Sequence, residues 1–353
     1  MRVAQCCFRR YRLRFKRHVD SVLPSRHGHN GPAAHREGVI VTLRDGSGRE
    51  GHGEIAPLLG LHREGLEKVI EALPGVRETM MGTDWSPKQS ALWGQFDKTL
   101  GAIAGSVRCG VEMALADLLG AFETDEEVAV CGLMAADGSI CEEVETLAAG
   151  GYKVAKVKVG RRPLSEDVEI VRRIRERLGG RIRLRLDANR AWGLDDAVEF
   201  CRRIGGDGIE YIEEPVVDPG DQGTFVRKTG LPIGLDETLS QVEPEDPAIA
   251  EGVAAVILKP AVIGGLSRTA RWIAVAKRRG VQAVLSSCFE SAVAVRAYAA
   301  MAARLGVGRT AQGLDTLKFL REDVAKEPPV IRGGCMAMER LTLRDEGLEE
   351  IRV

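Results

Sequence analysis

The sequence has 353 residues, of which 44% are hydrophobic and 29% are charged, and its formal net charge is −1. These values are typical of a globular protein with one large domain and a smaller one. A charge this close to zero gives no electrostatic basis for binding nucleic acid or an anionic membrane. The sequence contains no apolar run of about 18 or more residues, and its N-terminus lacks the apolar core of a signal peptide. We therefore expect a cytoplasmic protein without a membrane span.

The distribution of cysteine and histidine restricts the chemistry. The eight cysteines are scattered and include no CxxC pair, which indicates reduced thiols. The six histidines all lie within the first 62 residues. Any chemistry beyond His62 must therefore proceed without imidazole, which argues against a zinc site or a histidine base there.

The N-terminal region, residues 1–125, is predicted to be a small α+β domain that serves as a cap, with strands first and helices after them. Apolar and basic residues alternate along Arg9–Arg17, which is the period of a half-buried strand rather than of a nucleic-acid patch. Val39–Leu43 and His52–Ile55 predict a hairpin. The GxGxxG match at Gly46–Gly51 lies in its turn, whereas a dinucleotide fingerprint would open a helix, so nucleotide binding is disfavoured.

Two helices are predicted in the rest of this region, over Leu61–Leu73 and Gly105–Phe122, from apolar residues at helical spacing. The polar stretch Leu23–Pro32 contains Gly and Pro and is predicted to be a loop, either an ordinary connection or a mobile lid.

Residues 126–315 repeat the order strand, loop, helix, which implies parallel strands covered by helices. The strand candidates are Val128–Gly132, Val154–Val159, Ile182–Asp187, Ile209–Glu213, Pro232–Asp236, Ala254–Leu258, Val281–Leu285 and a segment near Gly308–Gln312. The helix candidates are Glu166–Leu178, Leu194–Ile204, Leu266–Arg279 and Glu290–Arg304. About eight such units predict an α/β fold of the modified (β/α)8, TIM-like barrel type. An open doubly wound sheet is the alternative.

The C-terminal segment, residues 316–353, has strand-like stretches at Val330–Ile331 and Leu341–Leu343. We expect this segment to pack back on the cap and to complete it.

Charged residues stand at the ends of five successive predicted strands. They are Lys158, Asp187, Glu213, Asp236 and Lys259, at intervals of 29, 26, 23 and 23 residues. Each interval is about one βα unit, so all five residues are expected at the same end of neighbouring strands. In barrel enzymes this carboxyl-terminal end holds the active site.

The three carboxylates in this set, Asp187, Glu213 and Asp236, would repel one another unless a cation neutralised them. Oxygen ligands without histidine or thiolate select a hard ion, so we predict Mg²⁺, with Mn²⁺ as the alternative. A metal flanked by Lys158 and Lys259 suits abstraction of a proton alpha to a carboxylate: the metal stabilises the enediolate and a lysine takes the proton.

Lys156 and Lys158 lie two residues apart on a predicted strand, so their side chains point to the same face. Repulsion between two ammonium groups and their desolvation both favour the neutral amine that a general base requires.

Taken together, Lys156-x-Lys158, Asp187-Ala-Asn189, Glu213-Glu-Pro215, Asp236-Glu237 and Lys259-Pro260 resemble the motif set of the enolase superfamily, in its muconate-cycloisomerase-like subgroup. The resemblance covers nearly the whole chain. It implies a cap plus a modified barrel, one essential Mg²⁺ and two lysines on opposite faces of the substrate. The absence of late histidines argues against the mandelate-racemase-like subgroup.

Roles for individual residues follow from this resemblance. Asp187, Glu213 and Asp236 would ligate the metal, with Asn189, Glu214 and Glu237 next to them. Lys158 would be the base, Lys156 would tune it, and Lys259 would act from the opposite face.

Within the subgroup, several stretches are most similar to the o-succinylbenzoate synthase family. They are Arg36–Leu43, Gly53–Pro57, Leu258–Gly265, Leu285–Ser291 and Gln312–Leu317. The implied reaction, in menaquinone or phylloquinone biosynthesis, is the syn dehydration of 2-succinyl-6-hydroxy-2,4-cyclohexadiene-1-carboxylate (SHCHC). Lys158 would take the proton and return it to the departing hydroxyl, and Lys259 would stabilise the intermediate by a cation–π contact.

The same resemblance implies which residues bind the substrate. The succinyl carboxylate would be held by Gly264, Gly265, Ser286 and Ser287, with Ser25, Arg26, His27 and Gly28 as part of the lid.

Other functions stay open at this point. An N-succinylamino acid racemase or a dipeptide epimerase would use Lys158 and Lys259 as two bases, one on each face. Dipeptide epimerases often carry acidic residues at the end of the last barrel strand, where Asp315 is the nearest candidate. A catalytically silent barrel is a third option. The expected partner is a small carboxylate substrate, and the sequence leaves open whether the chain is a homo-oligomer.

Overall fold

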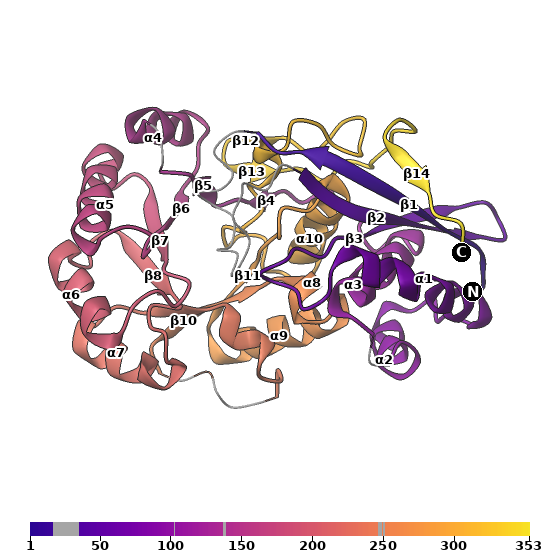
Figure 1. The fold of residues 1–353 in the computed structure, drawn as a ribbon, viewed down its shortest axis with the longest axis horizontal. Helices are drawn as coiled ribbons and strands as arrows, with labels where there is room; N and C mark the ends of the chain where they lie inside the picture. Colours follow the sequence, from indigo (N-terminus) through magenta and orange to yellow (C-terminus); the bar gives the residue numbers. More distant parts are fainter. Residues whose placement is uncertain (17–34, 102, 137–138, 246–248, 250) are drawn as a thin grey trace.

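The structure is a computed structural model that describes residues 1–16, 35–101, 103–136, 139–245, 249 and 251–353. A cap of strands and helices lies beside a curled parallel sheet that is covered by helices (Figure 1). The two termini lie near each other on the cap, at the end of the molecule farthest from α5 (Leu164–Leu178) and α6 (Leu194–Ile204).

The cap contains an antiparallel sheet of four strands in the order β14-β1-β2-β3. Its members are β1 (Val3–Arg14), β2 (His35–Asp45), β3 (Glu50–Ile55) and β14 (Leu348–Glu350). The predicted hairpin is confirmed, because β2 and β3 pair from Val39↔Ile55 to Arg44↔Glu50. The last residues of the chain therefore lie against the first strand.

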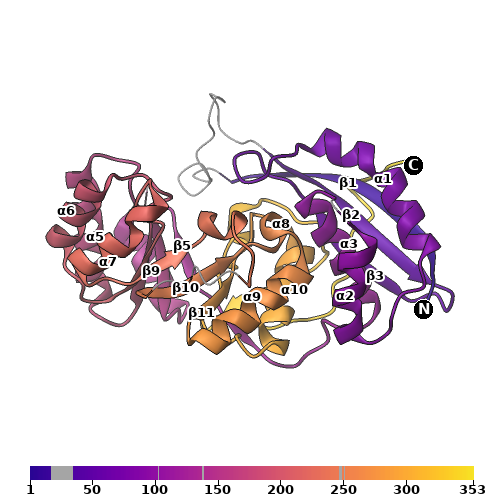
Figure 2. The same cartoon turned by 90° about the horizontal axis from the view of Figure 1, so that it is seen from below.

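Three helices of the cap lie beside this sheet (Figure 2): α1 (Leu66–Gly82), α2 (Gln89–Thr99) and α3 (Gly105–Leu118). The helix α3 crosses β3 very closely, because a Cβ atom on Gly53 would lie 2.0 Å from the carbonyl oxygen of Gly110. Only glycine permits this approach.

The first helix of the cap lies farther along the chain than the predicted range Leu61–Leu73. The helix α1 begins at Leu66 and continues through Pro74 to Gly82. Val76 and Met80 lie on the same buried face as Leu73. The burial of this apolar stripe outweighs the hydrogen bond that Pro74 cannot donate.

The barrel is built on a seven-stranded parallel sheet in the order β11-β10-β9-β8-β7-β6-β5. The strands are β5 (Gly132–Met134), β6 (Val154–Lys158), β7 (Arg183–Asp187), β8 (Ile209–Glu213), β9 (Ile233–Leu235), β10 (Val253–Leu258) and β11 (Gln282–Leu285). Between and after them lie α4 (Ile140–Ala149), α5, α6, α7 (Gln222–Thr229), α8 (Pro260–Ile263), α9 (Leu266–Arg279) and α10 (Ala292–Arg304). Figures 1 and 2 show α5, α6 and α7 outside the curled strands.

The outer helix α6 buries a single stripe. In α6, the buried residues are Ala197, Phe200, Cys201 and Ile204, which recur at intervals of three or four residues. This spacing places them on one face of a helix, against the sheet. The amphipathic pattern therefore determines that α6 covers the barrel from outside.

The eighth predicted strand, near Gly308–Gln312, is not a strand in the structure. Gln312 forms an isolated parallel bridge with Val130, and Gly313 forms another with Ser286. These two residues thereby connect the chain just before β5 with the chain just after β11. The segment is too short to form a ladder of its own, but it completes the ring through its backbone hydrogen bonds.

The C-terminal segment differs in detail from the prediction. A small antiparallel sheet joins β12 (Ile331–Arg332), β13 (Cys335–Met336) and β4 (Val128–Ala129). The predicted strand Leu341–Leu343 is absent from the described residues and is represented by one bridge, Ala325↔Leu343. Among the described helices, none is long and apolar enough to cross a membrane.

Candidate active site

Strand register brings the predicted charged residues to one end of the barrel sheet. Lys158 pairs in register with Asp187, and Asp187 with Glu213. Asp236 follows β9 directly, and Lys259 follows β10. Because the strands are parallel, these ends share the carboxyl-terminal side of the sheet.

Lys156 lies between two carboxylates. Its Nζ atom is 2.9 Å from Asp187 Oδ2 and donates a hydrogen bond to Glu213 Oε2. Both carboxylates are buried. A single ammonium group therefore neutralises part of the negative charge contributed by β7 and β8.

Lys158 contacts the same carboxylate and an amide. Its Nζ atom donates to Asp187 Oδ2 at 3.0 Å and to Asn189 Oδ1 at 2.6 Å. Asn189 in turn donates from Nδ2 to Glu237 Oε1 at 2.9 Å. Its φ of 44° is a left-handed conformation that asparagine tolerates better than most residues. Asn189 thus connects the predicted base to Glu237.

Lys259 forms an ion pair with Asp236, at the opposite end of the carboxylate cluster from Lys158. In the sheet order, β7, β8 and β9 separate β6 from β10. Lys158 and Lys259 therefore approach from strands that the curl of the sheet brings to face each other.

Glu214 supports the loop that contains Asp236. Its Oε1 atom accepts from the backbone N–H of Asp236 at 2.9 Å and of Thr238 at 2.8 Å. Its Oε2 atom accepts from Arg190 Nε at 2.8 Å and from Gln222 Nε2 at 3.1 Å. Glu214 is fully buried and has a φ of 40°. These contacts hold the backbone on both sides of the carboxylate cluster.

The pKa values of the lysines separate in direction. Burial lowers the pKa of Lys158, the nearby Asp187 raises it, and the positive charges of Lys156, Arg161 and Lys259 lower it further, with a net lowering. For Lys259, by contrast, the Asp236 and Glu237 carboxylates outweigh burial and raise the pKa. Lys158 is thus the lysine whose surroundings favour the neutral amine.

Burial raises the pKa of Glu213 to about 7, although Lys156 opposes this effect. The carboxylates of Asp187 and Asp236 raise it as well. The lysines therefore leave part of the repulsion among the three carboxylates uncompensated.

The fit of a metal ion can be judged from these donors. Within the described ranges, no three His, Cys, Asp or Glu side chains are arranged around one ion, and the carboxylates pair with lysine ammonium groups instead. The donor chemistry nevertheless suits a hard cation, since buried oxygens predominate. In addition, Glu237 Oε2 is buried without a hydrogen-bond partner among the described residues. The chemistry of these oxygen donors fits Mg²⁺, and ligation of the ion by Asp187, Glu213 and Asp236 stays a prediction.

A cavity of about 580 Å³ opens at this end of the sheet. Lys156, Lys158 and Lys259 line it, together with Ser286 and Ser287. The predicted serines thus lie beside the predicted lysines.

Two predicted glycines do not line the cavity. Gly264 and Gly265 form the turn between α8 and α9, where a Cβ atom on Gly265 would lie 2.6 Å from Glu112 Oε2. Their special backbone conformation serves helix packing rather than the cavity wall. The predicted lid residues Ser25, Arg26, His27 and Gly28 lie outside the described residues.

Other lining residues were missed from the sequence. Arg161 follows Lys158 by three residues, and its position on the strand-to-loop turn could have indicated a further cation beside the three lysines of the site. Gly313 and Thr316 line the cavity from the segment that closes the ring. Leu61, from the cap, lines it too, so the cap contributes directly to the cavity.

A family model described as Enolase C-terminal domain-like matches residues 139–342, more than half of the chain. The chain belongs to the enolase superfamily. This finding confirms the resemblance drawn from the motifs.

The curated relatives are similar over most of this chain. It is 34% identical over 311 residues to o-succinylbenzoate synthase of Salmonella typhimurium. This match covers 87% of this chain and 91% of that protein. It is 33% identical over 343 residues to Protein PHYLLO, chloroplastic, of Arabidopsis thaliana, which covers 82% of this chain. The match covers 20% of the plant protein, so the chain spans about a fifth of that relative's length.

Solved structures of the superfamily share the fold. A muconate lactonizing enzyme gives a TM-score of 0.80 at 22% identity and covers 98% of both chains. The L-Ala-D/L-Glu epimerase from Bacillus subtilis also gives 0.80 at 22% identity and covers 100% of both chains. At this identity the likenesses show the fold alone, and they confirm the predicted barrel with its N-terminal cap.

Proposed function

We propose that this enolase-superfamily chain is an o-succinylbenzoate synthase, which dehydrates SHCHC to 2-succinylbenzoate in quinone biosynthesis with Mg²⁺ as cofactor. The observation that carries the proposal is that Lys158 and Lys259 line the same cavity. They come from β6 and β10, which three other strands separate, and buried carboxylates lie between them. The similarity to the Salmonella synthase over 91% of that protein supports the choice of reaction.

Lys158 would begin the reaction as a neutral amine. Burial and the charges of Lys156 and Arg161 lower its pKa, so its lone pair is available for the proton alpha to the substrate carboxylate. Asn189 holds the amine in place through its Oδ1 atom at 2.6 Å. Lys158, now protonated, would return that proton to the hydroxyl that leaves from the same face.

Mg²⁺, bound by Asp187, Glu213 and Asp236, would supply a Lewis acid for the substrate carboxylate, whose negative charge grows as the proton leaves. Lys259 would face the other side of the substrate ring and stabilise its negative charge by electrostatic and cation–π contact.

The serines would position the succinyl group. Ser287 Oγ lies 2.5 Å from Thr316 Oγ1, and both residues line the cavity with Ser286. Gly313 contributes no side chain, and a Cβ atom there would lie 2.7 Å from Ser286 Oγ. The space beside Ser286 therefore depends on glycine at position 313.

The surroundings of Asp315 disfavour a dipeptide epimerase. Its Oδ2 atom accepts from Leu133 N at 3.0 Å and from Lys318 Nζ at 2.5 Å, and its Oδ1 atom accepts from Tyr152 OH at 3.2 Å. Both oxygens are thus engaged by the protein itself, which opposes binding of a peptide ammonium group.

A second candidate, N-succinylamino acid racemase, remains consistent with the same cavity. It requires a lysine on each face of the substrate, and both Lys158 and Lys259 line the cavity. It shares the succinyl group with SHCHC and presents no free ammonium group to Asp315.

The test assays the purified protein with Mg²⁺ against SHCHC, an N-succinylamino acid and an Ala-Glu dipeptide, each with and without EDTA. Conversion of SHCHC that EDTA abolishes supports the synthase. Racemisation of the N-succinylamino acid without dehydration of SHCHC would replace the proposal by the second candidate. No turnover of any of the three would favour a silent barrel.

A further inference from the structure

One wall of the barrel cavity comes from residues 286–291, which follow β11. Ser286, Ser287, Cys288 and Phe289 of this segment line the cavity. Phe289 has a φ of 61°, a left-handed conformation that is strained for an aromatic residue. A conformation of this kind persists only where the surrounding structure holds it. The shape of this wall therefore depends on what contacts Phe289.

A buried arginine of the cap holds the backbone of Phe289. Arg36 belongs to β2 and is 1% exposed. Its Nε atom donates to the carbonyl oxygen of Phe289 at 3.1 Å, across the boundary between cap and barrel. Its other nitrogens donate to carbonyl oxygens of the cap itself, Nη1 to Glu37 at 3.0 Å and to Pro57 at 2.9 Å, and Nη2 to Ala56. One guanidinium group thus fixes Phe289 relative to the cap.

The shape of an arginine side chain suits this position. The hydrogen bonds of Arg36 reach three segments of the chain: β2, the stretch after β3 and the loop after β11. A planar fork of donors can span these segments, whereas the ammonium group of a lysine presents all its donors from one atom. Hydrogen bonds from a charged donor are about twice as strong as neutral ones. The cap thus supplies a contact that offsets the backbone strain at Phe289.

The ring of Phe289 belongs to a small aromatic cluster. Its centroid lies 6.2 Å from that of Phe15 and 5.9 Å from that of Phe319, and the ring planes meet at 85° and 65°. Phe15 follows β1 in the cap, and Phe319 belongs to the C-terminal segment. The packed ring and the backbone that Arg36 holds together make Phe289 a fixed apolar part of the cavity wall.

We propose that Arg36 is a positioning residue that holds the Phe289 wall for the apolar ring of the substrate, so that a cap residue governs substrate binding in the barrel. The proposal rests on the assignment of the barrel cavity as the substrate site. The hydrogen bonds of Arg36 go to backbone carbonyl groups, which transfer no proton. Its loss should therefore raise KM more than it lowers kcat.

Cys288 reports on the wall without an assay of the reaction. It is buried, lines the cavity and donates its backbone N–H to Glu290. Its alkylation by iodoacetamide is followed by mass spectrometry of the peptide. Arg36→Ala should speed this alkylation about tenfold, because opening of the segment then costs about 1.4 kcal/mol less. Cys6 in the cap and Cys201 in α6 are also buried, and they should react as slowly as in the wild type.

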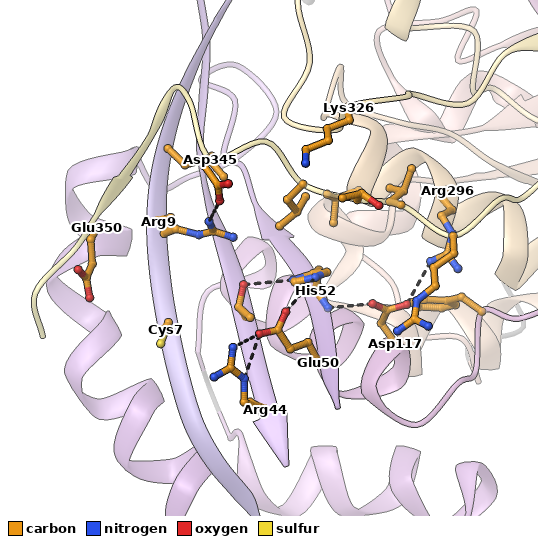
Figure 3. Close-up of a pocket in the computed structure, with 18 of the residues that line it drawn as sticks. Cys7, Arg9, Arg44, Glu50, His52, Asp117, Arg296, Lys326, Asp345 and Glu350 are labelled. Carbon is orange, nitrogen blue, oxygen red and sulfur yellow. Dashed lines mark hydrogen bonds and ion pairs between the residues drawn. The ribbon is translucent and has the colours of Figure 1, made fainter. Parts of the chain in front are cut away.

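The matched control is Arg296→Ala, which removes a second buried arginine between barrel and cap. Arg296, in α10, pairs with Asp117 of α3 at 3.1 Å, and Figure 3 shows the two side chains pointing toward each other. Among the described residues, those that line the barrel cavity do not include Arg296. This variant should lose stability, but the alkylation of Cys288 and the KM should stay as in the wild type.

Steady-state kinetics with SHCHC and Mg²⁺ measure the effect on the substrate. Arg36→Ala should raise KM at least about tenfold and keep kcat within about threefold of the wild type. Guanidinium chloride, added well below denaturing concentrations, should restore part of the KM, because the free ion can occupy the space of the lost side chain. If Arg36→Ala does not fold, Arg36→Lys takes its place, since one ammonium group cannot reach the same carbonyl groups.

Two kinds of result would overturn the proposal. The first is a variant at Arg36 whose KM and Cys288 alkylation equal those of the wild type. The second is an equal effect in Arg296→Ala, or faster alkylation of Cys6 and Cys201 in step with Cys288, either of which would show a general loosening of the protein. If the wild type does not dehydrate SHCHC while Cys288 responds as expected, the proposed reaction fails, and the hold of Arg36 on the wall is supported by the alkylation alone.

Discussion

Glu54 connects the cap to the barrel, and its removal is expected to destabilise both. This β3 residue is 2% exposed. Its carboxylate accepts from Ser291 N at 2.9 Å, Ser291 Oγ at 2.6 Å and Ala294 N at 3.1 Å, and it also accepts from Tyr11 OH. A cap residue thus satisfies the first backbone donors of α10, a barrel helix.

The expected loss in free energy of unfolding follows from the donors that Glu54 accepts from. Glu54→Leu removes a negative charge from the N-terminus of α10, where the helix dipole favours it by about 0.3–2 kcal/mol. It also leaves buried donors unpaired, and each such donor costs about 1–3 kcal/mol. Relaxation recovers part of this loss, so we expect a fall of about 3–5 kcal/mol in the free energy of unfolding. Tyr11→Phe, which removes one donor, should cost about 1 kcal/mol.

Urea denaturation, followed by circular dichroism, measures the effect as a shift of the unfolding midpoint. The control is Glu37→Leu, which removes an acid of the same sheet whose side chain is 36% exposed and pairs with Arg10. Such an exposed pair contributes about 1 kcal/mol or less. If Glu54→Leu were within 1 kcal/mol of the wild type, or if Glu37→Leu were equally destabilising, the assignment of Glu54 as the connection between cap and barrel would be refuted.

Three further predictions concern the barrel end. Asp187→Asn should raise the Kd for Mg²⁺ at least about tenfold, since it removes a charged oxygen ligand; isothermal titration checks this, and unchanged affinity would contradict the carboxylate site. Burial and the Glu54 carboxylate raise the pKa of Glu290 to about 7, although Arg36 lowers it, so the wild type should lose stability as the pH rises from about 4.5 through 7. Glu290→Gln lacks this loss, so its free energy of unfolding relative to the wild type should rise across that window by up to about 3 kcal/mol. An equal difference between the two proteins at pH 4.5 and at pH 8 would contradict this prediction. Lys259→Arg should dehydrate SHCHC faster than Lys259→Ala, because it keeps the positive charge that pairs with Asp236. An equal loss of rate in both variants would indicate proton transfer by Lys259.

The sequence predicts the parts of the site that depend on local periodicity. Alternation in β6 places Lys156 and Lys158 on one face, and the even spacing of strand ends predicts the register that the structure shows between Lys158, Asp187 and Glu213. Both signals come from residues that are close in sequence or that repeat at regular intervals.

Other features depend on contacts between distant segments. Glu54 and Ser291 are 237 residues apart, and no local pattern indicates that one caps the helix of the other. Gly264 and Gly265 are predicted from the sequence to hold the succinyl carboxylate, whereas the structure places them in the α8–α9 turn, where Glu112 packs against Gly265. The two-residue closure at Gln312 and Gly313 is likewise determined by the two strands on either side of it.

The central claim is that Lys158 removes the alpha proton. Single-turnover dehydration of SHCHC with Mg²⁺ by the wild type, Lys158→Ala and the matched control Lys153→Ala, an exposed lysine just before β6, tests it most directly. We predict that Lys158→Ala lowers the rate by about 10²–10⁴-fold, with Mg²⁺ affinity and thermal stability kept, and that Lys153→Ala is unchanged. A rate for Lys158→Ala within tenfold of the wild type would contradict the claim.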